Sequence, residues 1–266
     1  MIFKVSHTLP DHANIFKPYE DVEGEHREPF VLDNGTTKSL YFTLDQLQSR
    51  MCSAQPTQLA VDYTRTMMGF LLFDSRPAHI GMIGLGGGSL LKFCYRHLPE
   101  TRFTVIEINP HVIALSQQFG VPEDKERITL VCGDGAQFVR ETSLRFDVLL
   151  VDGFDHKGQP PSLCSRRFYQ HCFEVLTPQG LLVANLHHDH PGHSVFTSRL
   201  SEAFDGNLVE VASKAKSNSI LFARKGQRIS IDELRQADPL AHLGPEVRAQ
   251  LCGEFSRIGW VMTEPG

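Results

Sequence analysis

A cluster of glycines between two apolar runs is the first feature of the sequence that could support chemistry. In HIGMIGLGGGSLLKF, Gly84, Gly86, Gly87 and Gly88 follow a short apolar run and precede a helical pattern. Glycines in such a turn let the backbone approach a ligand without interference from Cβ atoms, and the amides that begin the helix face the same space. The pattern favours a nucleotide or nucleoside site, but a tight strand–helix turn packed on a sheet has the same composition.

An acidic residue at the end of the next apolar run narrows the choice of ligand. Glu107 closes RFTVIE, about twenty residues after the glycines, where a carboxylate can accept hydrogen bonds from both ribose hydroxyls. This geometry suits NAD and S-adenosyl nucleosides alike. Ser89 stands where the dinucleotide fingerprint needs Gly or Ala, which argues against NAD.

Further acids follow the next two apolar runs. Asp134 and Gly135 come after ITLVC, and Asp152 and Asp155 come after or close behind FDVLLV. A carboxylate at Asp134 can accept a hydrogen bond from the exocyclic amine of adenine. Each acid taken singly is equally well explained as a helix N-cap or a turn residue. Acids after three successive strands favour adenosine lying across the strand ends over a pyrophosphate stretched along one helix.

Alternating strands and helices must position these residues. The apolar runs HIGMIG, RFTVIEI, ITLVC, FDVLLVD and GLLVANL alternate with the helical patterns SLLKFCYRHL, PHVIALSQQF, GAQFVRE and SRRFYQHCFEVL. Such βαβ units place their strands parallel, and a sheet of this kind binds ligands beyond the carboxyl ends of its strands. We therefore expect an α/β domain with its site at that edge.

The segments on either side of this alternating region have a different pattern of apolar and polar residues. Residues 1–55 contain the short β-type runs MIFKVS, PFVLDN and SLYFTLD between polar turns, which predict a small antiparallel N-terminal β domain. Residues 56–74 keep apolar side chains on one helical face, which predicts a helix. NLVEVASKAKSNSILFARKG predicts an antiparallel hairpin at the sheet edge, and residues 230–258 are weakly helical. We divide the chain into residues 1–55 and a nucleoside-binding catalytic domain, residues 56–266.

Composition argues against several other classes of protein. The 266 residues carry a formal net charge of -5 and no basic run, whereas nucleic-acid binding needs clustered surplus Lys and Arg. There is no apolar stretch of about 18 residues that could span a membrane, and the first residues lack the pattern of a signal peptide. We expect a cytoplasmic protein that binds neither nucleic acid nor membranes.

A histidine-rich loop invites a metal interpretation. HHDHPGH, residues 187–193, follows the apolar run GLLVANL. Histidine is a common zinc ligand, but metal sites combine spaced ligands with a second shell that orients them. We expect a solvated loop near the mouth of the ligand site, and no metal.

Several motifs, taken in order, resemble the spermidine/spermine synthase (polyamine aminopropyltransferase) family. They are MIGLGGGSL, VIEINPHVI, VCGDGAQFV, FDVLLVDGFDHKG, SLCSRRFYQHCFEVLTPQGLLVANL and NSILFA. The resemblance covers roughly residues 38–225, and the run from Asp152 through Phe168-Tyr169 is its most specific part. It implies a Rossmann-like sheet of the S-adenosylmethionine-methyltransferase type behind a small antiparallel β domain. It also implies a homodimer.

The resemblance implies a role for each candidate residue of the donor site. Gln48 would contact the amino-acid-derived tail of the nucleoside, Glu107 would hold the ribose, and Asp134 with Gly135 would hold adenine. The loop glycines that would leave room for the nucleoside are Gly84, Gly86 and Gly88.

The resemblance also implies an acceptor site and a reaction. Asp152 would be the base beside the attacking amine, Asp155 would anchor that amine, and Tyr63 would help to orient it. The implied activity is transfer of an aminopropyl (alkyl) group from an S-adenosyl sulfonium to a small-molecule amine.

Two departures from the family pattern leave alternatives open. Gly87 stands where the family carries an acid that grips the free amine of decarboxylated S-adenosylmethionine, and His156 and Lys157 follow Asp155 where the family has an uncharged turn. The co-substrate is therefore either decarboxylated S-adenosylmethionine or S-adenosylmethionine itself. The alternatives to aminopropyl transfer are an S-adenosylmethionine-dependent methyltransferase on the same scaffold and a catalytically silent nucleoside-binding protein.

Overall fold

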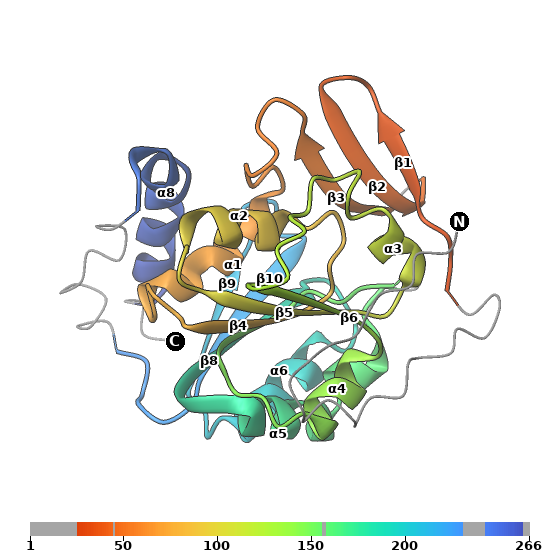
Figure 1. The fold of residues 1–266 in the computed structure, drawn as a ribbon. Helices are drawn as coiled ribbons and strands as arrows, with labels where there is room; N and C mark the ends of the chain where they lie inside the picture. Colours follow the sequence, from red (N-terminus) through yellow and green to blue (C-terminus); the bar gives the residue numbers. More distant parts are fainter. Residues whose placement is uncertain (1–25, 45, 156–157, 231–242, 263–266) are drawn as a thin grey trace.

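Two β-sheets of unequal size organise the chain (Figure 1). The computed structural model describes residues 26–44, 46–155, 158–230 and 243–262. The smaller sheet is antiparallel, in the order β1-β2-β3, with β1 at Phe30–Asp33, β2 at Thr37–Thr43 and β3 at Gln46–Cys52. The predicted strand in MIFKVS lies outside the described residues, and the domain boundary at residue 55 stays a prediction.

The larger sheet has seven strands in the order β6-β5-β4-β7-β8-β10-β9. The strands β4 to β8 pair in parallel, while β10 pairs antiparallel with both β8 and β9. This sheet confirms the predicted α/β fold and the predicted edge hairpin. The bounds are β4 His79–Ile83, β5 Arg102–Glu107, β6 Ile128–Cys132, β7 Phe146–Val151, β8 Leu176–His187, β9 Leu208–Ala212 and β10 Asn218–Arg224.

Helices cover both faces of the larger sheet, as the parallel arrangement requires. One face packs against α1 (Asp62–Met67), the 3₁₀ helix η1 (Met68–Leu72), α2 (Ser89–His97) and α8 (Pro245–Val261). The other packs against α4 (Gly135–Glu141), the 3₁₀ helix η2 (Pro161–Cys164), α5 (Arg166–Val175) and α6 (His193–Ala203). Figure 1 shows these two layers above and below the strands, with α3 (Pro110–Ala114) beside the smaller sheet.

The helix predicted over residues 56–74 is shorter than expected and begins only at Asp62. The backbone N–H of Leu59 donates to Gln250 Oε1 on α8 (3.3 Å), and the Leu59 carbonyl accepts from Arg65. Tertiary contacts therefore satisfy these backbone groups in place of helical hydrogen bonds. In the weakly helical region, residues 231–242 lie outside the described residues and α8 accounts for most of the rest.

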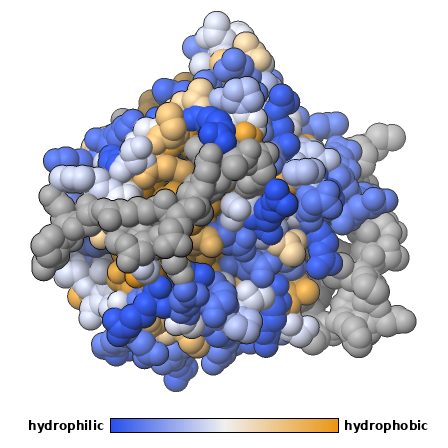
Figure 2. Space-filling view, turned by 90° about the vertical axis from the view of Figure 1, so that its left-hand side faces the viewer, coloured by the Kyte–Doolittle hydropathy of each residue, from blue (hydrophilic) through white to orange (hydrophobic). Residues whose placement is uncertain are grey.

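The surface is mostly polar on the face that Figure 2 shows, where hydrophobic residues appear in small separate patches. Within the described part of the chain, no helix combines the length and the apolar character needed to cross a bilayer. Most of the buried apolar side chains fill the two layers between the larger sheet and its helices.

Candidate active site

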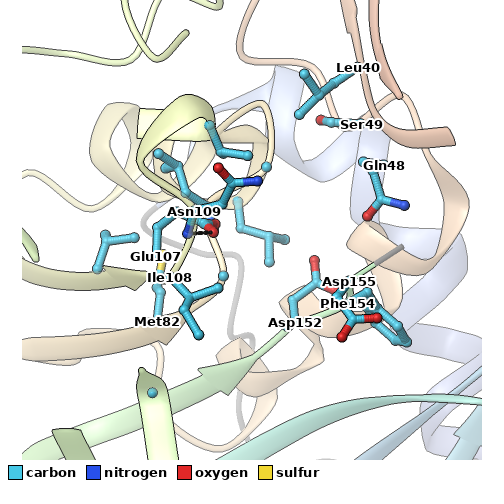
Figure 3. Close-up of a pocket in the computed structure, with 18 of the residues that line it drawn as sticks. Leu40, Gln48, Ser49, Met82, Glu107, Ile108, Asn109, Asp152, Phe154 and Asp155 are labelled. Atoms are coloured by element: carbon cyan, nitrogen blue, oxygen red, sulfur yellow. Dashed lines mark hydrogen bonds between the residues drawn. The ribbon is translucent and has the colours of Figure 1, made fainter. Parts of the chain in front are cut away.

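A cavity of about 380 Å³ lies at the carboxyl ends of β4 to β7, with the smaller sheet forming one wall. Parallel strands end at this edge, so residues far apart in the sequence meet there. In Figure 3, Glu107 and Asn109 lie on one side of the cavity, Asp152 and Asp155 on the other, and Gln48 above them. The predicted site residues that line the cavity are Gln48, Tyr63, Gly84, Gly86, Glu107, Asp134, Gly135, Asp152 and Asp155.

Gly88 is the predicted site residue that is not among the described residues lining the cavity. It is the N-cap of α2 with φ +66°, and a Cβ at this position would lie 2.5 Å from Val121 Cγ2. Gly88 therefore serves the turn and its packing, which is the second explanation that the glycine pattern left open.

Gly84 brings the glycine loop into contact with the end of β7. Its φ is +95°, and a Cβ there would lie 2.3 Å from the carbonyl oxygen of Asp152. On the other side of the same junction, the Asp152 N–H donates to the Ile83 carbonyl at 2.8 Å. Because Gly84 has no side chain, the glycine loop can lie directly against the backbone of Asp152.

Gly84→Ala is expected to lower the free energy of unfolding by about 2 kcal/mol or more, because a strained φ adds to a backbone clash. Urea unfolding measures this loss. Gly120→Ala is the matched control, since Gly120 also has a positive φ (+68°) but nothing lies within 4 Å of its Cβ position. Equal losses in the two variants would show that the contact with Asp152 does not constrain the loop.

Glu107 is held in place by backbone amides on either side of it. Its Oε2 accepts from Leu85 N–H and its Oε1 accepts from Asn109 N–H, each at 2.9 Å, and the side chain is 8% exposed. Burial raises the pKa of the carboxyl, and these backbone hydrogen bonds partly offset that rise. A carboxylate offers about four lone-pair positions, so each oxygen can still accept from a ligand hydroxyl in the cavity.

Asp134 combines a structural role with a place in the cavity wall. It is the N-cap of α4, where its Oδ1 accepts from Gln137 N–H at 2.8 Å. The N-cap interpretation of this acid is therefore correct, and among the described residues only Oδ1 takes part in the cap, which leaves Oδ2 to accept from a ligand amine. The next residue, Gly135, packs directly against the sheet, since a Cβ there would lie 2.5 Å from Ile83 Cγ2.

Asp152 is the centre of a hydrogen-bond chain that crosses the sheet. Its Oδ2 accepts from the Tyr63 hydroxyl at 3.1 Å and its Oδ1 accepts from Asn185 Nδ2 at 2.8 Å. Asn185 Oδ1 in turn accepts from Asn218 Nδ2 at 2.9 Å. Both carboxylate oxygens are therefore oriented by side-chain donors, Tyr63 in the cavity wall and the buried Asn185, and the Asp152 side chain itself faces the cavity.

The environment of Asp152 favours its neutral form more than water would. Burial raises the pKa of the Asp152 carboxyl, and the hydrogen bonds from Asn185 and Tyr63 work in the opposite direction. Burial, and then the charge of Asp152, hold the pKa of the Tyr63 hydroxyl well above its usual range. Tyr63 therefore stays a donor to the carboxylate, while Asp152 can take up a proton at a pH where a solvated aspartate could not.

Asn185 and Asn218 are residues of the site that the sequence interpretation missed. Asn185 is 1% exposed and lies on β8 within the apolar run GLLVANL. A polar side chain in a strand that is buried on both faces needs a partner, and that was the available signal. The identity of the partner depends on the neighbouring strand.

Asp155 lies in a tight turn beyond Asp152. Its N–H donates to the Gly158 carbonyl at 2.9 Å, and Gly158 N–H donates to the Asp155 carbonyl at 3.1 Å. His156 and Lys157, the residues that depart from the uncharged turn of the family, lie outside the described residues. Phe154, in the same segment, packs edge-on against His187 with ring centroids 4.8 Å apart.

Ser49 occupies the space beside Gly87, where the resemblance places an acid. A Cβ on Gly87 would lie 2.6 Å from Ser49 Oγ and 2.9 Å from Phe119 Cδ1. Ser49 Oγ also lies 3.3 Å from Ser89 Oγ, and both serines line the cavity. This part of the wall therefore presents two neutral hydroxyls.

Comparisons with known proteins identify the family of this chain and agree with its fold. The model of the spermine/spermidine synthase domain matches residues 61–216. A polyamine aminopropyltransferase of Neisseria meningitidis is 34% identical over 229 residues, which cover 84% of this chain and 87% of the relative. The chain belongs to the spermine/spermidine synthase family and is a transferase.

Solved structures of two kinds of protein, a spermidine synthase and a methyltransferase-like protein, share this fold. A spermidine synthase in complex with the transition-state analogue AdoDATO superimposes with a TM-score of 0.57 and 19% identity, covering 89% of this chain and 85% of that one. Human methyltransferase-like protein 13 in complex with SAH superimposes with a TM-score of 0.61 and 21% identity, covering 78% and 95%. The methyltransferase-type sheet predicted from the sequence is thereby confirmed.

Proposed function

We propose that the protein transfers an aminopropyl group from decarboxylated S-adenosylmethionine to a small-molecule amine. One observation carries the proposal: a partly buried carboxylate, Asp152, is oriented by Tyr63 and Asn185 across the cavity from Glu107. Membership of the spermine/spermidine synthase family supports it.

In the proposed complex the nucleoside spans the strand ends. Glu107 accepts from the ribose hydroxyls, Asp134 accepts from the adenine amine, and Gln48 contacts the tail. The sulfonium then lies between Glu107 and Asp152. A cavity of about 380 Å³ falls within the range of about 300–1,000 Å³ that is common for small-molecule sites.

The acceptor side must supply an unprotonated amine. A primary amine with a pKa of about 10.4 is neutral in only about one molecule in 2,500 at pH 7, a deficit of roughly 4.6 kcal/mol. Asp155 and Asp152 attract the ammonium, and Tyr63 keeps the Asp152 carboxylate in position. The nitrogen attacks the aminopropyl carbon, the carbon–sulfur bond breaks, and methylthioadenosine leaves.

The reaction also requires the removal of one proton from the attacking amine. The amine nitrogen gains a carbon and gives up one proton, which passes to the Asp152 carboxylate and then to water. The raised pKa of Asp152 assists the transfer, because the match between donor and acceptor improves as the two pKa values approach each other. Sulfonium is already a good leaving group, so positioning supplies the remainder of the catalysis.

A second candidate donor is S-adenosylmethionine itself, used for methyl transfer. The neutral hydroxyls of Ser49 and Ser89 favour it, because the described residues next to Gly87 offer hydroxyls and no carboxylate to the free amine of the decarboxylated donor. Loss of one carboxylate partner of a buried ammonium costs about 2 to 5 kcal/mol. The amine and the carboxylate of S-adenosylmethionine could both bind hydroxyls and backbone amides there.

The reaction products distinguish these functions. We expect that incubation with decarboxylated S-adenosylmethionine and a panel of linear diamines releases methylthioadenosine and adds one aminopropyl unit to an amine, as detected by mass spectrometry. Addition of one methyl group from S-adenosylmethionine would establish the second candidate instead. Binding of methylthioadenosine without turnover of either donor would identify a nucleoside-binding protein and contradict both.

A further inference from the structure

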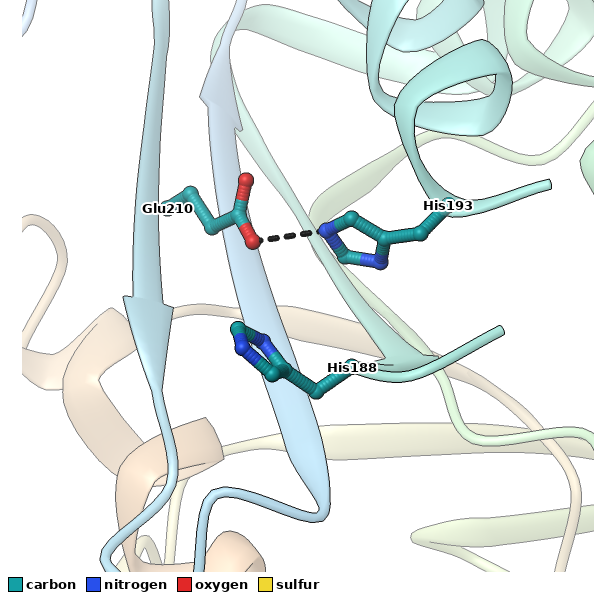
Figure 4. Close-up of side chains that lie close together, drawn as sticks. All are labelled: His188, His193 and Glu210. Atoms are coloured by element: carbon teal, nitrogen blue, oxygen red, sulfur yellow. Dashed lines mark hydrogen bonds and ion pairs between the residues drawn. The ribbon is translucent and has the colours of Figure 1, made fainter. Parts of the chain in front are cut away.

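The histidine-rich loop after β8 is brought against strand β9 in the fold. His188 comes from this loop, His193 from the first position of α6 and Glu210 from β9, and one ligand atom from each lies within 4.8 Å of the others (Figure 4). His193 Nε2 and Glu210 Oε1 are 2.8 Å apart. The side chains of His193 and Glu210 are 18% and 33% exposed, so the cluster is sheltered but reachable from solvent.

The hydrogen bonds of His193 fix which ring nitrogen faces the cluster. Nδ1 lies 3.2 Å from the carbonyl oxygen of His187, and a carbonyl can only accept, so Nδ1 carries the hydrogen. In the neutral ring Nε2 then presents a lone pair to the carboxylate oxygen of Glu210. Two acceptors facing each other at this distance need a cation between them, either a proton or a metal ion.

His188 is oriented by a buried residue of the neighbouring strand. Its Nδ1 lies 2.7 Å from the hydroxyl of Ser219, which is on β10 and 0% exposed. This contact leaves Nε2 of His188 as the ligand atom. Metal-bound histidines in proteins almost always bond their second nitrogen to a carbonyl, carboxylate or other polar group, and both histidines here do so.

The backbone that carries the histidines is itself fixed. His188 N–H donates to the Ser217 carbonyl at 3.0 Å, which ties the loop to the start of β10. His190 N–H donates to the His187 carbonyl, and His193 N–H donates to the His190 carbonyl. Glu210 lies opposite Leu221 in the β9–β10 ladder. All three side chains therefore project from ordered backbone, as a preorganised site requires.

We propose that His188, His193 and Glu210 bind a zinc-type divalent ion. Two imidazoles and one carboxylate, with a water molecule in the fourth position, form a tetrahedral set that suits Zn²⁺. In a tetrahedral site with ligand distances of about 2.0–2.2 Å, the ligand atoms lie farther apart than the 2.8 Å between His193 Nε2 and Glu210 Oε1, so this pair must open by roughly half an ångström to admit the ion. Mg²⁺ and Ca²⁺ prefer all-oxygen sets and are excluded by the imidazoles.

The site is separate from the proposed reaction and adds no step to it. It lies beyond the end of the strand that carries Asn185, and the ring of His187 between them packs on Phe154 in the cavity wall. A bound ion would hold the loop at residues 187–193 against β9 and so stabilise the acceptor side of the cavity. The prediction that this loop is only solvated is replaced by this proposal.

Zinc titration of the untagged, chelator-treated protein tests the proposal. Isothermal calorimetry with ZnCl₂ is expected to show one ion bound per chain, and CaCl₂ is expected to show none. His193→Ala and Glu210→Gln are each expected to weaken zinc binding by about 100-fold or more, and Ser219→Ala, which keeps all three ligands, by about 10-fold. Far-UV circular dichroism verifies that each variant is folded.

Two histidines serve as matched controls. His190 lies in the same loop, but its Nδ1 accepts from Gly192 N–H; His171 pairs with Glu174 at 3.3 Å on another surface. Zinc affinity should be unchanged in His190→Ala and His171→Ala. The absence of zinc binding by the wild type, equal affinity in the Glu210→Gln variant, or loss of binding in His190→Ala would overturn the proposal.

Discussion

Replacing Asp152 by Asn is expected to lower the rate of amine alkylation by about 10²- to 10⁴-fold, the usual contribution of a positioned general base. The affinity for methylthioadenosine should stay within about tenfold, because Asp152 does not contact the ribose or adenine in the proposed complex. Single-turnover rates with decarboxylated S-adenosylmethionine and the best diamine measure the first effect, and calorimetry measures the second.

The pH profile separates a base from a merely structural carboxylate. Burial raises the pKa of Asp152 above its ordinary value of 3.8, so the wild-type rate should fall as pH is lowered through this raised pKa and the carboxylate becomes protonated. The Asn variant should lack this limb of the profile. An unchanged rate in the variant would contradict the role of Asp152.

The same substitution should not unfold the protein. Because the folded-state pKa is raised, the folded protein binds the proton more tightly than the unfolded chain does. The stabilisation is complete below the ordinary pKa and is lost as pH rises through the raised value. Asn carries no charge to desolvate and can keep both hydrogen bonds once the Tyr63 hydroxyl rotates. The urea midpoint of Asp152→Asn at pH 7 should therefore equal or exceed that of the wild type.

Replacing Glu107 by Gln is expected to raise the dissociation constant of methylthioadenosine by about 100-fold, which corresponds to loss of one charge-assisted hydrogen bond or more. The amide group can accept from only one of the two backbone N–H groups, Leu85 and Asn109, that now bind the carboxylate. Its nitrogen then faces the other donor, so the side chain must turn or leave that donor unpaired. Calorimetry measures the affinity.

Asp134→Asn provides the control for this prediction. It makes the same chemical change at the end of the next strand, but the amide oxygen can still cap α4, so only the one hydrogen bond from the adenine amine is lost. The expected loss of affinity is less than about tenfold. If Glu107→Gln bound methylthioadenosine as tightly as the wild type, the ribose would not lie on Glu107.

The sequence was sufficient to predict the sheet and the edge at which the cavity lies. Strict alternation of apolar runs and helical patterns implies parallel strands, and parallel strands bring the ends of β4, β5, β6 and β7 to one edge. Residues directly after those strands, such as Glu107 and Asp134, therefore converge on the cavity without any knowledge of side-chain contacts.

Contacts that depend on strand order could not be predicted in the same way. The bonds from Asn185 to Asp152 and from Asn218 to Asn185 each join residues 33 positions apart, and β10 enters the sheet antiparallel. His193 and Glu210 are 17 positions apart, and their contact joins the start of α6 to β9. Local patterns showed a polar residue in a strand and histidines in a loop, but did not identify their partners.

Local signals were ambiguous where tertiary structure decides between two meanings. The glycine pattern does not distinguish Gly84, which allows contact with Asp152, from Gly88, which serves the turn. The apolar periodicity before Asp62 is that of a helix, yet the backbone N–H and C=O of Leu59 bond to the side chains of Gln250 on α8 and of Arg65. At these residues the tertiary contacts override the local helix propensity.

A crystal structure with methylthioadenosine bound tests the central claim most directly. The account predicts that both ribose hydroxyls lie within hydrogen-bond distance of Glu107, that adenine lies at Asp134, and that the sulfur points across the open cavity toward Asp152. A nucleoside whose ribose lies away from Glu107, or whose sulfur points away from Asp152, would contradict it.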